Sequence, residues 1–181
     1  MSEKEMMVLV DEQDNQIGLM EKIETHEKCL LHRAFSGFVF NDSGELLIQK
    51  RSSTKYHNPG IWANTVCSHP RHGELIKDAV KRRLGEELGF ILDFKVHQFF
   101  IYRAEFQNGL TEHELDYVCT ARYDGQHIVQ NPEEVAEIRW ISIPTLMEEI
   151  NADPDAFAYW LKKILELDIL KKTIADHCPS S

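Results

Sequence analysis

The sequence predicts an α+β domain in which a mixed or mostly antiparallel sheet is flanked by helices. Short segments rich in β-branched and aromatic residues recur along the chain between turn-forming residues, a pattern typical of strands. One longer segment repeats apolar residues at the spacing of a helix. With 181 residues, 43% of them hydrophobic, the chain is long enough to bury one core. We therefore expect a single domain over residues 1–181.

The predicted strands are short and lie between turn signals. We expect them at residues 6–11, 17–20, 34–40, 46–49, 96–104, 115–122 and 135–141. The clearest turn is the sequence NDSG at residues 41–44, which joins two of these strands into a hairpin. Residues 52–70 contain prolines and no clear period, so they predict a long loop with short strand pieces around Trp62.

The predicted helices are marked by apolar spacing and by end signals. Residues 75–88 give the strongest pattern, because apolar side chains recur every fourth position and Gly89 follows where a glycine commonly ends a helix. Pro144 stands at the start of a second helical pattern, a position that suits proline. A C-terminal helix is expected over residues 155–171. Its inward side chains would be Phe157, Leu161, Ile164, Leu165 and Ile169.

Composition and charge limit the classes of partner. Thirty acidic and twenty basic residues give a formal net charge of −10, which disfavours non-specific binding to nucleic acid. No run of about 18 apolar residues is present, so we expect no membrane partner, and the N-terminal sequence is too acidic for a signal peptide. The cysteines are far apart, which favours reduced thiols and a cytoplasmic location. They are Cys29, Cys67, Cys119 and Cys178.

Carboxylates near the end of the strongest helix form a first candidate site. Glu86 and Glu87 are adjacent there, and Arg83 shares a face with Glu87 because it lies four residues earlier. The alternative is a solvated helix with an ordinary ion pair. Glu74 before the helix and the glycine after it favour a functional segment.

A thiol, an imidazole and a strand of carboxylates form a second candidate site. Cys67 stands two residues before His69, although a lone cysteine is more often a small buried residue than a reactive group. Glu112, Glu114 and Asp116 alternate along a strand and therefore point to one face. Three carboxylates on one face favour a bound cation, and the alternative is an exposed edge of the sheet.

Two further histidines fit such a cation site. His26 and His32 would join His69 to give three imidazoles, and with two carboxylates this donor set suits Zn²⁺, Mn²⁺ or Fe²⁺ better than Ca²⁺. A single histidine taken alone is more often a surface or core residue than a ligand.

Positive charge is concentrated in one short stretch of this acidic chain. Lys50, Arg51 and Lys55 lie close together at the end of a predicted strand. Such a cluster favours an anionic ligand, and the alternative is a solvated hairpin edge protected by lysine.

The segment GELIKDAVKRRLGEELGF, residues 73–90, resembles a Nudix box, a loop–helix–loop whose glutamates hold magnesium against a diphosphate. The matching positions are Glu74, Arg82, Glu86 and Glu87. Two positions depart from the pattern: Ser68 falls on its first glycine, and Arg83 falls where Nudix hydrolases carry another glutamate. The resemblance implies a Nudix-like fold, whereas the missing carboxylate argues against diphosphate hydrolysis.

Three more segments resemble type 1 isopentenyl diphosphate isomerase, a family with a Nudix-like fold that interconverts isopentenyl and dimethylallyl diphosphate. They are LLHRAFSGFVFN, NPGIWANTVCSHP and TEHELDY, and the resemblance covers about residues 8–160. It implies that Cys67 and Glu114 are the catalytic acid/base groups and that Tyr102 and Trp160 are aromatic residues of the active site.

The same resemblance implies two metals and a set of substrate contacts. One transition metal, Zn²⁺ or Mn²⁺, would bind a first site formed by His26, His32, His69, Glu112 and Glu114. Mg²⁺ would accompany the diphosphate, held by Glu87 with the backbone carbonyl of Cys67 beside it. The residues that contact the diphosphate would be Lys22, Arg51, Lys55 and Arg83.

We further expect the segment from Lys22 to His26 to act as a lid and the chain to be a monomer or a weak dimer. The substrate partner would be a prenyl diphosphate. Two other functions stay open at this point: a Nudix diphosphohydrolase, and a metal-binding domain without catalytic activity.

Overall fold

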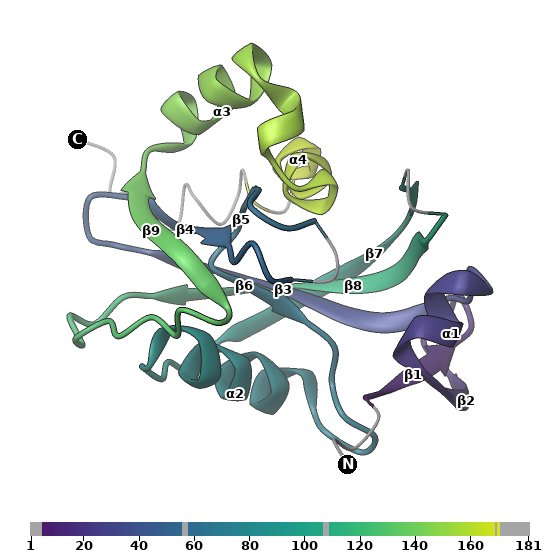
Figure 1. The fold of residues 1–181 in the computed structure, drawn as a ribbon. Coiled ribbons are helices and arrows are strands. Elements are labelled where there is room, and N and C mark those ends of the chain that lie inside the picture. The colour runs from purple at the N-terminus through teal and green to yellow at the C-terminus, as the bar shows by residue number, and fades with distance from the viewer. Residues whose placement is uncertain (1–4, 56–57, 107–108, 169, 171–181) are drawn as a thin grey trace.

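The computed structural model of the protein describes residues 5–55, 58–106, 109–168 and 170, and Figure 1 shows helices on both sides of a curled sheet. The strands are β1 (Met6–Val10), β2 (Gln16–Glu21), β3 (His32–Phe40), β4 (Leu46–Arg51), β5 (Trp62–Ala63), β6 (Val66–Ser68), β7 (Lys95–Glu105), β8 (Thr111–Arg122) and β9 (Val135–Ile141). The helices are α1 (Lys22–Glu27), α2 (Ile76–Leu88), α3 (Ile143–Ala152) and α4 (Tyr159–Glu166), with a 3₁₀ turn at Pro154–Ala156.

Strand β3 is the centre of the sheet. It pairs antiparallel with β1, β4 and β6 and parallel with β8. Strands β7 and β9 extend the sheet antiparallel to β8 and β4. The predicted α+β class with a mixed, mostly antiparallel sheet and flanking helices is therefore confirmed.

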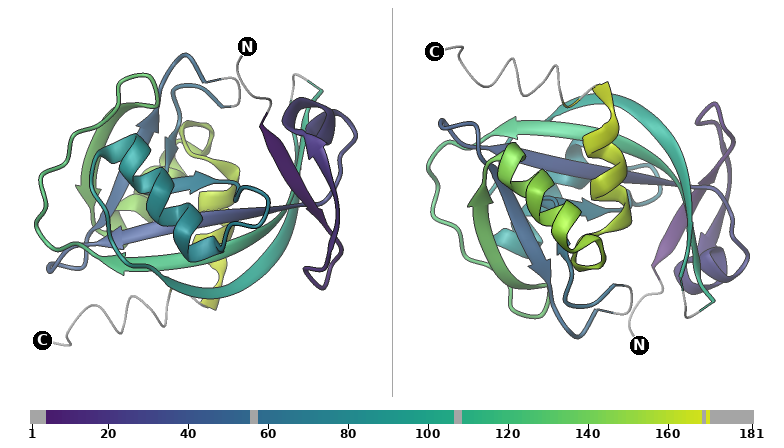
Figure 2. Two further views of the ribbon diagram at one scale, coloured as in Figure 1. Left: turned by 90° about the horizontal axis from the view of Figure 1, so that it is seen from below. Right: turned by 90° about the horizontal axis from the view of Figure 1, so that it is seen from above.

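Helices cover the two faces of the sheet because side chains alternate along β3. Phe35 and Val39 pack in the cluster under α2, whereas Phe38 and Phe40 pack in the cluster that contains residues of α3 and α4. The two views of Figure 2 show α2 across one face and the α3–α4 pair across the other. The β1–β2 hairpin and α1 lie together at one end of the sheet (Figure 2).

Two glycines fix the position and the end of α2. A Cβ atom at Gly37 would lie 2.7 Å from a methyl carbon of Val66 and 2.9 Å from one of Val80, so only glycine fits between the strand and the helix. Gly89 has a φ of +73° and its amide bonds to the Gly85 carbonyl at 3.1 Å, which confirms the predicted end of the helix.

Two helices differ from the prediction. Helix α1 was not expected, and its short sequence KIETHE carries no apolar repeat. The C-terminal helix begins only at Tyr159, because Phe157 is extended and forms a bridge with Trp62, whose carbonyl accepts a hydrogen bond from the Ala158 amide. Residues 169 and 171, predicted in this helix, lie outside the described residues.

The predicted start of α3 is confirmed in the described residues. Pro144 lies in the first turn of α3, and the side chain of Ser142 caps that helix. Cys29, Cys67 and Cys119 are free thiols, while Cys178 lies outside the described residues. Within the described part of the chain, no helix combines the length and the apolar character needed to cross a bilayer.

Candidate active site

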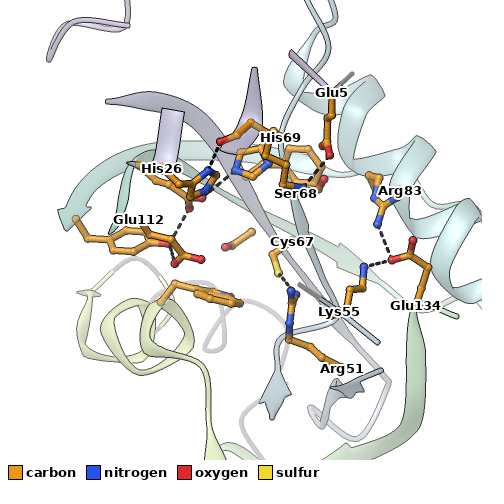
Figure 3. A pocket seen from close by; sticks show the side chains of 16 residues that line it. Glu5, His26, Arg51, Lys55, Cys67, Ser68, His69, Arg83, Glu112 and Glu134 are labelled. Atoms are coloured by element: carbon orange, nitrogen blue, oxygen red, sulfur yellow. Dashed lines mark hydrogen bonds and ion pairs between the residues drawn. The ribbon is translucent and has the colours of Figure 1, made fainter. Parts of the chain in front are cut away.

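A cavity of about 190 Å³ collects most of the residues that the sequence singled out. It lies among β3, β6, β7 and β8, with α1, the end of β4 and Trp160 of α4 also contributing to its wall. Every residue to which the family resemblance assigns a role lines it except His32 and Glu87, and each of these two contacts a lining residue. Other residues of the candidate sites do not line it: Lys50, Glu74, Arg82, Glu86 and Asp116. Figure 3 shows Cys67 between a histidine–glutamate group and a group of basic residues.

Three histidines and one glutamate form the first group. One potential ligand atom from each of His26, His32, His69 and Glu114 lies within 4.8 Å of all the others. Helix α1 supplies His26, β3 supplies His32, and β8 supplies Glu114, because Glu114 pairs with His32 in the parallel register of these strands. These distances allow all four atoms to bind one metal ion.

The hydrogen bonds of the histidines fit a metal site. Nδ1 of His26 lies 2.6 Å from the Lys22 carbonyl oxygen, and Nδ1 of His32 lies 2.9 Å from that of Leu30. A ring that donates from Nδ1 to a carbonyl keeps its Nε2 lone pair for a metal. Nε2 of His32 is buried and has no hydrogen-bond partner among the described residues. Burial lowers the pKa of His69 despite its bond to Glu114, which favours the neutral imidazole that metals require.

The carboxylates of β8 are buried, so the alternative of an exposed sheet edge is wrong. The Tyr102 hydroxyl lies 2.7 Å from one oxygen of Glu114 and 3.1 Å from one of Glu112. Burial and the neighbouring charge of Glu114 raise the pKa of Glu112. Burial opposes ionisation of Glu114 as well, but the neighbouring imidazoles of His32 and His69 outweigh burial and hold its pKa well below the usual range. Glu112 lies beside the group of four and remains a predicted ligand.

Cys67 lies on β6 at the centre of the cavity. Burial raises the pKa of its thiol to about 12, so the group keeps its proton at neutral pH. The Arg51 guanidinium lies 3.9 Å from its sulfur. The backbone of Cys67 pairs with Ser36 of β3, which fixes the thiol relative to the carboxylates of β8. A protonated thiol that lines the cavity can give a proton to a bound molecule.

Arg51, Lys55 and Arg83 lie on the other side of the cavity (Figure 3), whereas Lys22 belongs to α1 together with His26. Lys22 pairs with Glu5 at 2.8 Å, and Lys55 pairs with Glu134. Lys50 points elsewhere and pairs with Glu137 outside the cavity. The run of basic residues is therefore not a uniformly solvated edge.

Arg83 occupies the position where a Nudix hydrolase would carry a further glutamate. Its guanidinium contacts the carboxylates of Glu86 at 2.8 Å and of Glu134 at 3.1 Å, and it also pairs with Glu87. Glu87 is buried, and the side-chain amide of Gln49 donates to its other oxygen at 2.7 Å. Glu87 is therefore held in one orientation by two neighbours.

Trp160 forms an apolar wall of the cavity. Its indole nitrogen donates to the side chain of Asn64 at 3.0 Å, and Asn64 in turn donates to the carbonyls of Gly37 and Val66. The Arg51 guanidinium lies 5.6 Å from the centre of the indole ring. The ring therefore presents a face that can stabilise positive charge.

Sequence reasoning missed several residues that hold these groups. They are Glu5, Gln49, Asn64 and Glu134. No local pattern separates Glu134 from its neighbour Glu133, and Gln49 lies within an ordinary strand. Only the pairing of distant segments shows what these side chains contact.

The fold and the altered Nudix helix define the class of the protein. A family model described as NUDIX domain matches residues 30–162, and the chain belongs to that family. A protein from Deinococcus radiodurans has a similar structure, with a TM-score of 0.73 at 24% identity over 89% of this chain and 97% of that one. This likeness shows the fold.

Sequence relatives identify the branch of the family. The isopentenyl-diphosphate Delta-isomerase of Burkholderia multivorans is 46% identical over 90% of this chain and 92% of that protein. The isopentenyl-diphosphate Delta-isomerase 2 of Photorhabdus laumondii is 47% identical over 89% of this chain and 90% of that protein. The chain belongs to the isopentenyl-diphosphate Delta-isomerase family, which is a family of isomerases. Membership of this family and of the NUDIX family implies the use of a divalent metal.

Proposed function

We propose that this chain interconverts isopentenyl diphosphate and dimethylallyl diphosphate, with Cys67 and Glu114 as its acid/base pair. The observation that carries the proposal is that both groups line one cavity, between the histidine–glutamate group and the basic residues. The basic residues suit the diphosphate, and the partly buried thiol and the buried carboxylate suit the hydrocarbon part of the substrate.

The reaction needs one proton added and one removed. Addition of a proton to the terminal carbon of the double bond leaves a tertiary carbocation at the branched carbon. Loss of a proton from the next carbon toward the diphosphate forms the new double bond. An alkene is a very weak base, so the acid must act where water cannot compete for its proton. Glu114 is buried and Cys67 is partly buried, and the indole of Trp160 stabilises the cation by about 2 kcal/mol when dry.

The proposal includes two metals and a lid. His26, His32, His69 and Glu114 would hold Zn²⁺ or Mn²⁺, with Glu112 as a further ligand, and Glu87 would hold Mg²⁺ with the diphosphate. Bound cations supply positive charge that stabilises the ionised carboxylates and the diphosphate. The lid would be the segment from Lys22 to His26, which forms most of α1 beside the cavity.

Deuterated water provides the direct test of this function. Wild-type protein with isopentenyl diphosphate and Mg²⁺ should transfer deuterium from solvent into both prenyl diphosphates and release no phosphate. Phosphate release without isomerisation would instead support a diphosphohydrolase. Arg83 disfavours that second function, because a guanidinium stands where the hydrolase pattern has a carboxylate. A metal-binding domain without activity would give neither product.

Removal of one positive charge at Lys55 should weaken substrate binding. We expect Lys55→Gln to raise KM and the Kd of inorganic diphosphate by roughly tenfold, with kcat changed little, because the diphosphate keeps its charge during the reaction. Lys50→Gln is the matched control, since Lys50 is close in sequence but pairs with Glu137 outside the cavity. Equal effects of the two substitutions, measured by steady-state kinetics and calorimetry, would contradict the assignment.

A further inference from the structure

One carboxylate of the cavity has no role in the proposed reaction. Glu134 lies in the segment before β9 and contacts both Lys55 and Arg83, two of the residues proposed to bind the diphosphate. All three side chains are largely buried, with exposures of 27%, 21% and 17% for Glu134, Lys55 and Arg83. Glu134 therefore forms a bridge between two cations that come from different parts of the fold.

The backbone around Glu134 is fixed to the strand that carries the basic residues. The Ser52 amide donates to the Glu134 carbonyl at 3.1 Å, and the Glu134 amide donates to the Asn131 carbonyl at 3.0 Å. The register of β4 and β9 shifts between Lys50 and Arg51, immediately beside this point. Such a shift changes where the following side chains point. Figure 3 shows the result, with Glu134 facing Lys55 and Arg83.

The ammonium group of Lys55 is stabilised by a negatively charged partner such as Glu134. Burial lowers the pKa of Lys55 to about 8; the charge of Glu87 opposes this shift, and the charges of Arg51 and Arg83 reinforce it. A carboxylate placed between Lys55 and Arg83 reduces the repulsion of these two cations and favours the charged ammonium. An ammonium has three N–H donors, so a bond to Glu134 leaves two for a ligand.

We propose that Glu134 is a positioning residue for the diphosphate site, which holds Lys55 and Arg83 together and keeps their donors directed to the ligand. The proposal rests on the proposed function for the identity of the ligand as a prenyl diphosphate. The proposed role is one of binding, because one carboxylate holds two cations in place for a diphosphate group. This role is separate from proton transfer.

The test compares Glu134→Gln with Glu133→Gln. Both substitutions remove one negative charge from the same segment, but Glu133 is exposed and does not line the cavity. We expect Glu134→Gln to raise the Kd of inorganic diphosphate with Mg²⁺ by roughly tenfold, because its cations lose their shared partner. Glu133→Gln should change this Kd less than about twofold, and Glu134→Asp should restore part of the affinity, because it keeps the charge. Calorimetry measures these values without any turnover.

A double-mutant cycle shows whether Glu134 acts through Lys55. In a Lys55→Gln background, Glu134→Gln should have a clearly smaller effect on the Kd than in wild type, because one of its two partners is already neutral. A merely structural role would give the same effect in both backgrounds and would lower the melting temperature. If Glu134→Gln does not fold, the same cycle is run with Glu134→Asp.

Kinetics distinguishes the two proposals. The KM of Glu134→Gln should rise while kcat at saturation stays within about twofold of wild type. Unchanged or tighter diphosphate binding by Glu134→Gln would overturn the positioning role, because the carboxylate would then be a bystander or a competitor of the ligand. Absence of isomerisation by the wild type would overturn the proposed function and leave the diphosphate result intact.

Discussion

The substitution Cys67→Ala should almost abolish isomerisation while the protein still folds and binds its substrate. We expect kcat to fall by at least ~10²–10⁴-fold, the usual range for loss of one acid/base group. The Kd of inorganic diphosphate should stay near the wild-type value, because the basic residues and Glu87 are untouched. Cys67→Ser should also be impaired, since a hydroxyl preserves the size of the group but not the chemistry of the thiol.

The size of this effect follows from the environment of the thiol. Cys67 is partly buried, and burial raises the pKa of its thiol to about 12, so the thiol keeps its proton at neutral pH. Removal of the group deletes an interaction made in the transition state rather than in the bound substrate. Such a change lowers kcat and kcat/KM together.

The measurement combines steady-state kinetics with solvent deuterium exchange. Cys29→Ala serves as the matched control, because Cys29 is a free thiol that does not line the cavity. An epoxide analogue of the substrate, which the thiol can activate by protonation, should label Cys67 in the wild type, and diphosphate should slow this labelling. Wild-type turnover in Cys67→Ala would remove the acid/base role of this residue.

The parts of the fold that were predictable depend on local patterns. Helix α2 and the β3–β4 hairpin follow from apolar spacing, a turn sequence and Gly89, all of which act over a few residues. Helix α1 and the start of α4 depend on contacts between distant segments. Thr25 and His26 become buried only when α1 packs beside the sheet, and Phe157 is extended because it meets Trp62.

The candidate site also combines features that local patterns predict with features that depend on distant contacts. Alternation along one strand was enough to place Glu112, Glu114 and Asp116 on one face, and their burial confirms that placement. The convergence of His26 and His32 with Glu114 is a product of the β3–β8 pairing, which links residues about eighty positions apart. Sequence spacing alone does not bring these residues together, and only the resemblance to a known family indicated them.

Residues that act by contacting other functional side chains could not be predicted from the sequence. Glu134 and Gln49 matter because of the side chains that they contact, and those contacts cross from one segment to another. A carboxylate in a polar loop and an amide within a strand have no local signature. Their roles follow from the tertiary structure alone.

Removal of the metal from the histidine–glutamate group should abolish activity reversibly. We expect chelation to lower kcat by ~100-fold or more, since loss even of outer partners of a metal site reduces affinity or activity 10–100-fold. Added Zn²⁺ or Mn²⁺ should restore the rate, and the purified protein should carry one equivalent of a transition metal. Elemental analysis and activity measured on the same samples provide the check.

The physical reason lies in the four buried donors. Without a cation, Nε2 of His32 has no hydrogen-bond partner among the described residues, and the Glu114 carboxylate faces Nε2 of His69 at 2.9 Å and Nε2 of His32 at 3.5 Å. A bound metal satisfies these atoms and stabilises the folded protein by an amount set by mass action, about 2.7 kcal/mol at a hundred times its Kd. The melting temperature should therefore rise when metal is added back.

His32→Ala and His127→Ala separate the site from general effects of histidine loss. His32 is a member of the group of four, whereas His127 is exposed and far from it in the fold. His32→Ala should lose both metal and activity, and His127→Ala should keep both. Protein stripped of all metal that still isomerises at the wild-type rate would contradict a catalytic role for this site, and it would leave the acid/base proposal for Cys67 to stand without a metal beside Glu114.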